Sequence, residues 1–394
     1  MFEAIDQAKD DPILSLGVAY QQDPRPNKLD LGIGVYRNEQ GITPVMQAVT
    51  LASERLLAAQ TTQAYLGLAG NQSYNQAILD LLLGDTAAHA RSIAMQTPGA
   101  SGGLRLLADL IASIRPDATV WVSTPSYVNH QPIMEAAGLK VAYYPYFNPQ
   151  TKQVDEAAML EQVAKLGPKD VLLLHGCCHN PTGADISYAA WQQINQLALN
   201  HGFLPFIDLA YQGFGQGVDE DIAGLRLLAD SLPELVMTCS NSKNFGLYRE
   251  RTGAAIVVGK SLQQAMNARG KLFELARRSY TMPPNWGAAI VSEILGDEQL
   301  RDLWQQELNV MSVRMRGLRQ ALAEEFRTQS NSERFDYLSA HQGMFSLTGF
   351  SFEQTEQLRE QYGIYIVGGG RINIAGLAQQ SIPQLVSACL AVGA

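Results

Sequence analysis

The middle of the chain alternates short apolar runs with longer segments in which apolar residues recur every three or four positions. Short apolar runs are typical of buried strands, and the three-to-four spacing is typical of helices that pack one face on a core. The pattern predicts strands at 120–123, 141–146, 171–175, 203–207, 235–237 and 254–258, with helices from 104 and at 131–137, 155–166 and 188–200. Such alternation predicts an α/β fold, a mainly parallel sheet with helices on both faces.

The segments on either side have a different pattern. Helices are predicted at 13–20, 44–60, 71–83 and 300–326, and short strands at 344–347, 364–367 and 371–374. Apolar residues in the long helix recur at alternating steps of four and three from Trp304 to Leu322, which indicates packing in a core. The texture of the chain changes after this helix, so we place a domain change near its middle.

Polar side chains follow the apolar runs, at the predicted carboxyl ends of the strands. Asn180 follows the strand at 171–175, Asp208 and Tyr211 follow the one at 203–207, and Lys243 follows the one at 235–237. Ligands of open α/β sheets bind at this edge. A lysine placed there loses its charge easily when it is desolvated, and a neutral amine can form an imine.

Two further features indicate a site for an anion. The small residues of 97–103 precede a periodic helix, and a helix N-terminus offers free N–H groups to a phosphate. Arg251, eight residues after Lys243, can grip a phosphate with two hydrogen bonds. A phosphate group is therefore a ligand that these residues could hold, and an ordinary helix-capping loop is the alternative.

Composition excludes several classes of partner. Charged residues make up only 17% of the chain, the net charge is -9, and no basic run is present. This argues against nucleic acid and anionic membranes as partners. The acidic N-terminus has no apolar core of a signal peptide, and no apolar run approaches the ~18 residues of a membrane span. We expect a cytoplasmic protein.

The segment HGCCH at 175–179 contains the residue types of a metal site. Two adjacent cysteines on an extended chain point to opposite sides, so one centre could hardly use both. We therefore expect no metal there. Cys177 and Cys178 are instead expected in the core, with a hydrogen-bonded histidine, and His130 is expected behind Asp208.

Taken together, these segments resemble the class I aminotransferases of the fold-type-I pyridoxal phosphate group, and among them the aspartate and aromatic aminotransferases. The resemblance runs essentially end to end. It rests on LGIGVY (31–36), TPGASG (97–102), HGCCHNPTG (175–183), DLAYQGF (208–214), SNSKNFGLYRERTG (240–253), RRSYTMPP (277–284) and GRINIAG (370–376).

The resemblance implies roles for single residues with pyridoxal 5'-phosphate as the cofactor. Lys243 would form the imine and carry the proton, Asp208 would face the pyridine nitrogen, and Tyr211 and Asn180 would bond the ring's 3-oxygen. The phosphate would be held by Gly99, Ala100, Ser101, Ser240, Arg251 and, from a second subunit, Tyr65, and Ser242 would also bind the cofactor. Substrate would be bound by Gly34, Tyr127, Asn180, Arg371 on the α-carboxylate and the partner's Arg277 on a side-chain carboxylate.

The same resemblance implies a division of the chain and a reaction. Residues 1–43 would form an N-terminal arm and part of a small domain, 44–310 the large cofactor-binding domain, and 311–394 the rest of the small domain. The expected protein is a homodimer that transfers the amino group of L-aspartate to 2-oxoglutarate by a ping-pong mechanism. Alternatives are aromatic amino acids as main substrates, a lyase or decarboxylase on the same scaffold, and a cofactor-binding regulator.

Some positions depart from the family pattern and bear on substrate choice. Tyr127 stands where close relatives stack a tryptophan on the ring. Met282 and Ala64 are less polar than their usual counterparts, whereas the dicarboxylate type is favoured by Val35, Arg37 and Thr43. Relatives also often hold the bonds that match Thr124–Pro125 and Asn180–Pro181 in the cis form, so both are predicted cis.

Overall fold

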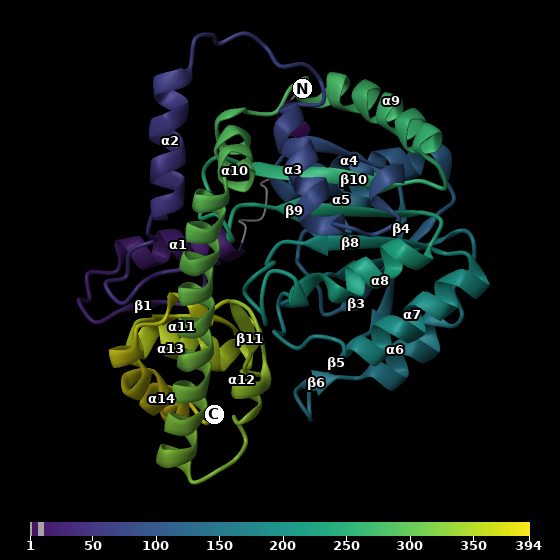
Figure 1. The fold of residues 1–394 in the computed structure, drawn as a ribbon. Coiled ribbons are helices and arrows are strands. Elements are labelled where there is room, and N and C mark those ends of the chain that lie inside the picture. The colour runs from purple at the N-terminus through teal and green to yellow at the C-terminus, as the bar shows by residue number, and fades with distance from the viewer. Residues whose placement is uncertain (1, 7–11) are drawn as a thin grey trace. The chain divides into compact units, whose positions relative to one another are not determined.

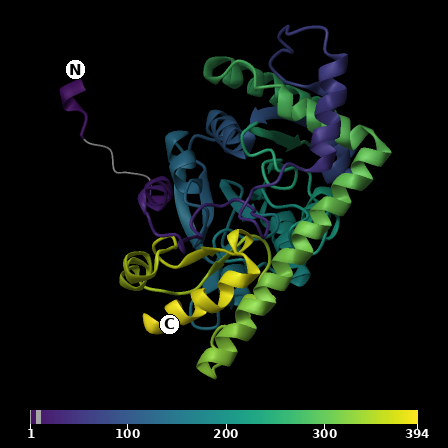
Figure 2. The ribbon, with the colours of Figure 1, turned by 90° about the vertical axis from the view of Figure 1, so that its left-hand side faces the viewer.

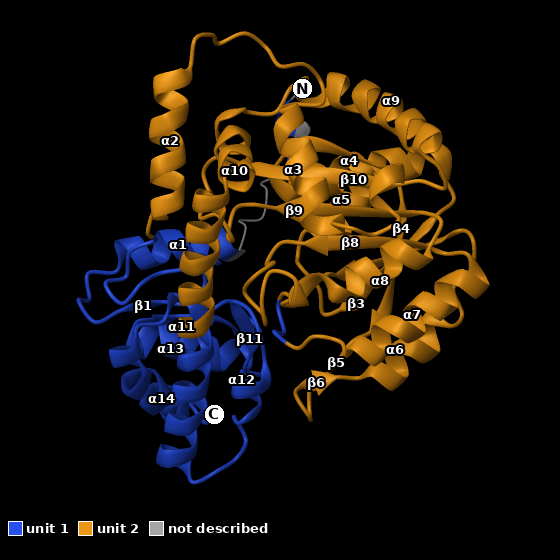
Figure 3. Ribbon diagram, in the orientation of Figure 1, with its two compact units in different colours: residues 1–43, 181–183, 315–394 blue, residues 44–180, 184–314 orange. Residues whose placement is uncertain are grey.

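The computed structural model describes residues 2–6 and 12–394, so part of the predicted N-terminal arm, residues 1 and 7–11, lies outside the described residues. The chain divides into two compact units (Figure 3). Unit 1 contains residues 1–43, 181–183 and 315–394, and unit 2 contains 44–180 and 184–314. Along the described part of the chain, no helix combines the length and the apolar character that a membrane crossing requires.

Unit 2 holds most of the regular structure. Its helices are α2 (Gln47–Ala59), α3 (Gln72–Leu83), α4 (Gly99–Ile114), α5 (His130–Ala136), α6 (Glu156–Val163), α7 (Tyr188–His201), α8 (Ala223–Ser231), α9 (Leu262–Ser279), α10 (Trp286–Gly296) and the first half of α11 (Glu298–Ser330). Its strands are β2 (Ser92–Pro98), β3 (Thr119–Thr124), β4 (Lys140–Pro145), β5 (Phe147–Asn148), β6 (Gln153–Val154), β7 (Asp170–His175), β8 (Leu204–Leu209), β9 (Leu235–Ser240) and β10 (Thr252–Val258).

Seven of these strands form the central sheet, in the order β2-β10-β9-β8-β7-β3-β4 (Figure 1). The pairs β9-β8, β8-β7, β7-β3 and β3-β4 are parallel, and β10 is antiparallel to both of its neighbours. The predicted α/β fold with a mainly parallel sheet is therefore confirmed. Because β10 runs backwards, its first residues lie at the edge where β2 and β9 end.

Helices cover both faces of this sheet. On one face α4, α5 and α9 bury a continuous apolar core against the strands, with Leu107, Phe206 and Ala255 fully covered. On the other side, α3, α6, α7 and α8 pack on one another and on the sheet (Figure 1). Removing apolar surface from water in this way drives the folding of the layers.

Unit 1 combines the two ends of the chain. In Figure 2 the purple segment after α1 lies beside the yellow C-terminal part, and β1 pairs in parallel with β12. The elements are α1 (Pro12–Gln22), β1 (Leu29–Asp30), the second half of α11, α12 (Tyr337–Ala340), β11 (Phe345–Leu347), α13 (Phe352–Tyr362), β12 (Ile364–Tyr365), β13 (Arg371–Asn373) and α14 (Ile382–Ala391). A separate apolar core joins α11, α13 and α14.

The structure confirms two predictions about single segments and contradicts others. The predicted apolar stripe of α11 is confirmed, since its members from Trp304 to Leu322 are buried. Strand β2 was not predicted, because its polar residues Gln96 and Thr97 are themselves fully buried and hide the apolar pattern. The Thr124–Pro125 bond is cis as predicted, but the prediction for Asn180–Pro181 is wrong, since this bond has the trans form that prolines usually take.

Candidate active site

Several chemistry-bearing residues of unit 2 lie at one edge of the sheet. Asp208 is the second-to-last residue of β8. His175 is the last residue of β7 and pairs directly with Asp208 in the register of the two strands. Lys243 follows the end of β9 by three residues. Three neighbouring parallel strands thus deliver an imidazole, a carboxylate and an amine to the same edge, and the sequence predicted this place for the carboxylate and the amine.

Lys243 has the properties of a nucleophilic amine. Its Nζ atom lies 4.7 Å from the centre of the Tyr211 ring, and the residue is half-buried. Desolvation is the main reason why the pKa of Lys243 is lowered to about 8; the negative charge of Asp208 opposes this shift, and the positive charge of Arg251 adds to it. A sizeable fraction of this amine is therefore neutral near pH 7 to 8, where an ordinary lysine is fully protonated.

Trp304 of α11 supports the loop that carries Lys243. The indole N–H of Trp304 donates to the backbone oxygen of Asn244 at 2.7 Å, and the indole stacks on Phe245 with ring centres 4.5 Å apart. Trp304 is fully buried. This support was not foreseen from the sequence, where Trp304 appeared only as a core residue.

Behind Asp208, three side chains form a directed chain of hydrogen bonds. His175 Nδ1 accepts from the backbone N–H of Asn180 at 3.3 Å, so the proton of neutral His175 sits on Nε2 and is donated to Ser126 Oγ at 3.2 Å. The Ser126 hydroxyl can then donate to His130 Nδ1 at 2.8 Å, which leaves His130 Nε2–H to donate to Asp208 Oδ2 at 2.9 Å. These tautomers are assigned from the network.

The network sets the charge state of Asp208. Burial alone would raise the pKa of this carboxyl group, but the hydrogen bond and the electrostatic effect of His130, together with His175 and Lys243, lower it overall. Desolvation, together with the nearby His130, lowers the pKa of His175 to about 3, which keeps that imidazole neutral. Asp208 is thus a buried carboxylate with one oxygen, Oδ2, bonded to His130.

The second oxygen of Asp208 is available. Oδ1 is buried and accepts no hydrogen bond from the described residues, and the same holds for Oδ1 of Asn180. Buried polar atoms are rarely left without a partner. These two acceptors therefore indicate that a polar ligand binds in this place.

A candidate anion site lies at the start of α4. Gly99 begins the helix with φ +69°, and a Cβ atom there would lie 2.6 Å from an Arg251 guanidinium nitrogen. The Gly99 N–H donates to the backbone oxygen of Arg251 at 2.8 Å, and the Arg251 guanidinium donates to Ser242 Oγ at 3.2 Å. The N–H groups of the first turn, including Ala100 and Ser101, have no partner within the helix.

The antiparallel direction of β10 explains why Arg251 lies close to both the start of α4 and the end of β9. Its register places Thr252 opposite Pro98 of β2 and Gly253 opposite Ser240 of β9. Arg251 precedes β10, so it meets the start of α4 and the end of β9 together. Gly253 is required by space, since a Cβ atom there would lie 2.7 Å from the Ala100 nitrogen.

Other predicted residues of unit 2 lie around the same edge. The Asn180 side-chain amide donates to the Tyr211 hydroxyl over a long 3.4 Å. Tyr127 makes an edge-to-face contact with His130 at 5.4 Å between ring centres, and its hydroxyl accepts from Asn129 at 3.2 Å. The hydroxyl that replaces an indole N–H is therefore engaged locally.

Tyr65 and Arg277 occupy a different place in the chain's own fold. Both line a cavity of about 610 Å³ together with Met282, and none of the described residues around Lys243 lines it. Tyr65 is 90% exposed. The backbone N–H of Leu66 donates to the Met282 sulfur at 3.1 Å, which ties the two walls of this cavity together.

Unit 1 contains the predicted carboxylate-binding residues Arg371 and Gly34. The Arg371 guanidinium donates to the Gly32 backbone oxygen at 2.7 Å, and its central carbon lies 4.4 Å from the centre of the Phe345 ring. A Cβ atom on Gly34 would lie 2.7 Å from the same ring. Phe345 therefore fills the space between the two predicted residues.

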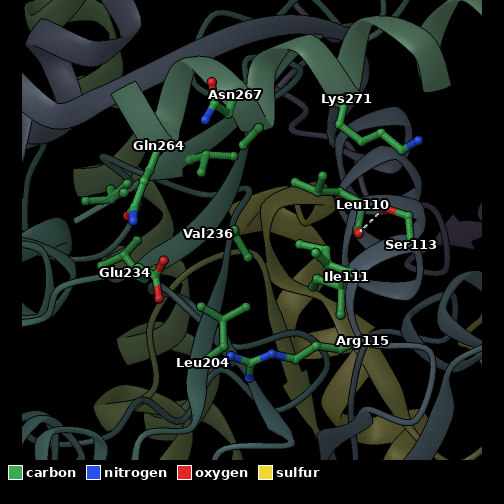
Figure 4. A pocket seen from close by; sticks show the side chains of 16 residues that line it. Leu110, Ile111, Ser113, Arg115, Leu204, Glu234, Val236, Gln264, Asn267 and Lys271 are labelled. Carbon is green, nitrogen blue, oxygen red and sulfur yellow. Dashed lines mark hydrogen bonds between the residues drawn. The ribbon is translucent and has the colours of Figure 1, made fainter. Parts of the chain in front are cut away.

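A second cavity, of about 450 Å³, lies at the opposite edge of the sheet (Figure 4). Leu204 and Leu235, the first residues of β8 and β9, line it together with the ends of α4 and β10 and part of α9. No predicted site residue lines it. The site around Lys243 and Asp208 is therefore separate from this cavity, whose lining is more apolar.

The extended conformation that was expected for the adjacent cysteines is wrong. Cys178 has φ +51° and is not extended, and the sulfurs of Cys177 and Cys178 converge with Asp221, all within 4.8 Å. The Asp221 carboxylate, however, accepts backbone N–H groups from Gly213, Gly215, Gln216 and Gly217. Hydrogen bonding to Cys178 and burial raise the pKa of Cys177 well above its usual value, which disfavours the thiolate that a metal binds.

Comparison with known proteins gives one consistent result. Residues 26–388 match the family model for class I and II aminotransferases. The aromatic-amino-acid aminotransferase of Pseudomonas aeruginosa is 42% identical over 390 residues, which cover 98% of each chain. The aspartate aminotransferase of Escherichia coli strain K12 is 40% identical over 395 residues, which cover 100% of each chain.

Solved structures agree with the sequence comparison. The aromatic-amino-acid aminotransferase from Burkholderia pseudomallei, solved covalently bound to pyridoxal phosphate, superposes with a TM-score of 0.96 at 37% identity. The match covers 100% of this chain and 99% of that one.

Proposed function

This chain belongs to the class I and II aminotransferases, and from that premise we propose that it transfers the amino group of L-aspartate, and of aromatic amino acids, to 2-oxoglutarate. Enzymes of this family depend on pyridoxal 5'-phosphate, so the chain is a pyridoxal-phosphate-dependent transaminase. The observation that carries the proposal is Lys243, an amine with a pKa of about 8 beside a buried carboxylate.

The described residues fit this cofactor. The buried Oδ1 atoms of Asp208 and Asn180 have no partner among them, which suits a protonated ring nitrogen and a ring hydroxyl. The start of α4, with Arg251 beside Gly99, suits a phosphate group. Ser101, Ser240 and Ser242 would add hydroxyl groups to that phosphate site. Tyr65 of a second copy would reach the same group.

When bound, pyridoxal phosphate supplies an aldehyde that bonds to amines and a ring that accepts the electrons of a broken Cα–H bond. Lys243 has two roles in the proposal. Its neutral Nζ would hold the cofactor by bonding to the aldehyde with loss of water, and the free amine would move the proton of the substrate's Cα to the cofactor's carbon. An amine with a pKa of about 8 suits both steps near neutral pH.

Asp208 would hold a proton on the ring nitrogen. Its carboxylate carries a full negative charge, because its pKa lies below the usual value. His130 fixes the orientation of the carboxylate through Oδ2 and leaves Oδ1 for the ligand. Tyr211 and Asn180 would bind the ring's 3-oxygen, and Tyr127 would stack on the ring.

Two arginines would bind the carboxylate groups of the substrate. Arg371 would bind the α-carboxylate that every amino acid carries, with the Gly34 backbone beside it. Arg277 would bind a side-chain carboxylate in the site of a second subunit, so the proposed enzyme is a homodimer with two shared sites. This assignment is supported by the separate cavity that Arg277 and Tyr65 line in a single chain.

Aromatic substrates are included because of Met282. This flexible apolar side chain lines the same cavity as Arg277, where a dicarboxylate enzyme usually has a polar residue. Methionine sulfur makes favourable contacts with aromatic rings. The lyase alternative is not favoured, since the matched relatives named above are aminotransferases. The cytoplasmic location stays a prediction.

A steady-state panel tests the proposal. Aspartate, tyrosine and phenylalanine are supplied one at a time with 2-oxoglutarate, and glutamate is measured. We expect glutamate from aspartate and from at least one aromatic donor, with no product when the keto acid is omitted. Release of ammonia or carbon dioxide without keto acid would instead identify a lyase or decarboxylase.

A further inference from the structure

We propose that Arg319 is a positioning residue for the substrate carboxylate, which it orients through Phe345 and Arg371. The inference rests on the proposed function, because it assumes that Arg371 binds this carboxylate. All of the contacts that support it lie within unit 1.

Arg319 is a buried arginine with an unusual set of partners. It lies in the second half of α11 and is only 1% exposed. Its guanidinium donates to five oxygen atoms of a single segment: the backbone oxygens of Leu338, Gln342, Gly343 and Phe345, and Oγ of Ser346. The two shortest of these bonds, at 2.7 Å, are to Phe345 and Ser346.

The segment that Arg319 holds has little regular structure of its own. Residues 341–344 turn the chain from α12 into β11, and Gly343 in this turn has φ +72°. Buried carbonyl groups in such a turn need donors from elsewhere. All five bonds come from Nη1 and Nη2, whose four N–H groups lie in one rigid plane, whereas a lysine offers three from one point, so arginine is suited to this spread of acceptors.

The same segment connects further inside unit 1. The Ser346 hydroxyl, which accepts from Arg319, lies 3.1 Å from His341 Nδ1 and can donate to it. The backbone N–H of Gln342 donates to the Gly183 oxygen at 2.7 Å. Hydrogen bonds with Arg319, between Ser346 and His341, and with Gly183 therefore fix this turn.

Phe345 carries the effect to the predicted carboxylate site. Its backbone oxygen is held by Arg319, and it pairs with Asn373 in the β11-β13 ladder. Its ring then lies against the Arg371 guanidinium and fills the space at Gly34. A shift of Phe345 would therefore change the plane in which Arg371 presents its N–H groups.

Residues of β13 bind the segment at 32–35, which forms another part of the predicted carboxylate site. Arg371 begins β13, and its guanidinium donates to the Gly32 backbone oxygen. The Asn373 amide donates to the backbone oxygens of Ile33 and Val35 at 2.6 and 2.8 Å. With these contacts made by β13, the ring of Phe345 is the part of the site whose position depends on Arg319.

The test measures binding of a simple carboxylate to the holoenzyme. The probe is 3-phenylpropionate, and its Kd is measured by calorimetry beside the Tm of each variant. Arg319→Lys should raise the Kd by about tenfold to a hundredfold, because small misplacements of binding groups have effects of this size. The control Val386→Ala, in the buried core of α14, should lower the Tm but leave the Kd within about twofold, since it removes apolar contacts and no hydrogen bond of the turn.

A double-mutant cycle tests the route through Phe345. Phe345→Leu removes the ring but keeps the backbone oxygen that Arg319 binds. If Arg319 acts through this ring, the double variant should bind the probe little more weakly than the weaker single variant. Losses that simply multiply would overturn the route.

Two further variants keep the outcomes distinguishable. Arg371→Ala should abolish probe binding; if it does not, the proposed role of Arg371 fails. If Arg371→Ala loses binding while Arg319→Lys has a lower Tm and an unchanged Kd, Arg319 is only structural and this inference is overturned. Should Arg319→Lys not fold, Ser346→Ala, which removes one acceptor of Arg319, must raise the Kd, and an unchanged Kd would refute the inference.

Discussion

Nε2 of His130 lies 2.9 Å from Oδ2 of Asp208, and both side chains are almost completely buried. The bond uses one carboxylate oxygen and leaves Oδ1 for a ligand. It also helps to keep the pKa of Asp208 below its usual value, against the effect of burial. One pair of residues thus determines both the charge and the direction of the group that would face the cofactor's ring.

The first prediction concerns the charge of Asp208. Asp208→Asn should lower kcat for aspartate by at least about a hundredfold, because an amide cannot keep the ring nitrogen protonated when the Cα proton is removed. The measurement is single-turnover kinetics with aspartate. A loss of only twofold or threefold, on the order of a minor contact, would contradict the assigned role.

Substitution of His130 provides a matched comparison. His130→Gln removes the imidazole but leaves the Asp208 carboxylate in place. We expect a smaller loss of kcat than in Asp208→Asn, since the charge remains and only its orientation is relaxed. A larger loss would mean that His130, and not Asp208, supplies the main effect.

The second prediction concerns pH. Only neutral Lys243 can bond to the aldehyde, so the rate at which the apoprotein captures added pyridoxal phosphate should rise with pH, with a midpoint of about 8. Because the negative charge of Asp208 raises the pKa of Lys243, Asp208→Asn should move this midpoint to lower pH. Stopped-flow absorbance checks both. A wild-type midpoint near the ordinary lysine value of about 10.4 would contradict the described environment.

The third prediction separates the two arginines. Arg371→Ala should lower kcat/KM for aspartate and tyrosine alike, whereas Arg277→Ala should depress aspartate and spare tyrosine. Loss of a bidentate contact to a carboxylate in a closed site costs on the order of 2–5 kcal/mol. This corresponds to roughly a thirtyfold to several-thousandfold loss. Equal losses for both substrates in Arg277→Ala would show that the side-chain pocket is misplaced.

The fourth prediction concerns the source of Arg277. Lys243→Ala and Arg277→Ala chains, each weak with aspartate, should regain activity when they form hybrid dimers. One of the two sites in a hybrid then holds an intact Lys243 and a partner's intact Arg277. No recovery in dimers confirmed as hybrids by native mass spectrometry would show that Arg277 acts within its own subunit.

The sequence predicted the sheet and its reactive edge because strands and helices there follow simple periods. Lys243, Asp208 and Asn180 were placed correctly at strand ends for this reason. β2 was missed, since Ser92, Gln96 and Thr97 are buried polar residues in a strand without an apolar pattern. Its pairing with β10 is what brings Arg251 to Gly99, and such long-range pairing leaves no local signal.

The supporting residues were harder to predict than the reactive ones. Ser126 bridges two histidines, and Trp304 holds the Lys243 loop, but neither contact follows from spacing along the chain. Cys178 was expected on extended chain, yet its φ of +51° turns the two cysteines toward each other. Conformations of this kind depend on neighbours such as Asp185, which accepts the Cys178 and His179 N–H groups.

The central claim is that Lys243 performs amino transfer, and product stoichiometry in wild type and Lys243→Ala tests it most directly. With aspartate and 2-oxoglutarate, the wild-type enzyme should form oxaloacetate and glutamate in equal amounts. Lys243→Ala should lose nearly all of this turnover while it still binds pyridoxal phosphate through the residues around Arg251. Unchanged turnover in Lys243→Ala, or no glutamate from the wild-type enzyme, would contradict the claim.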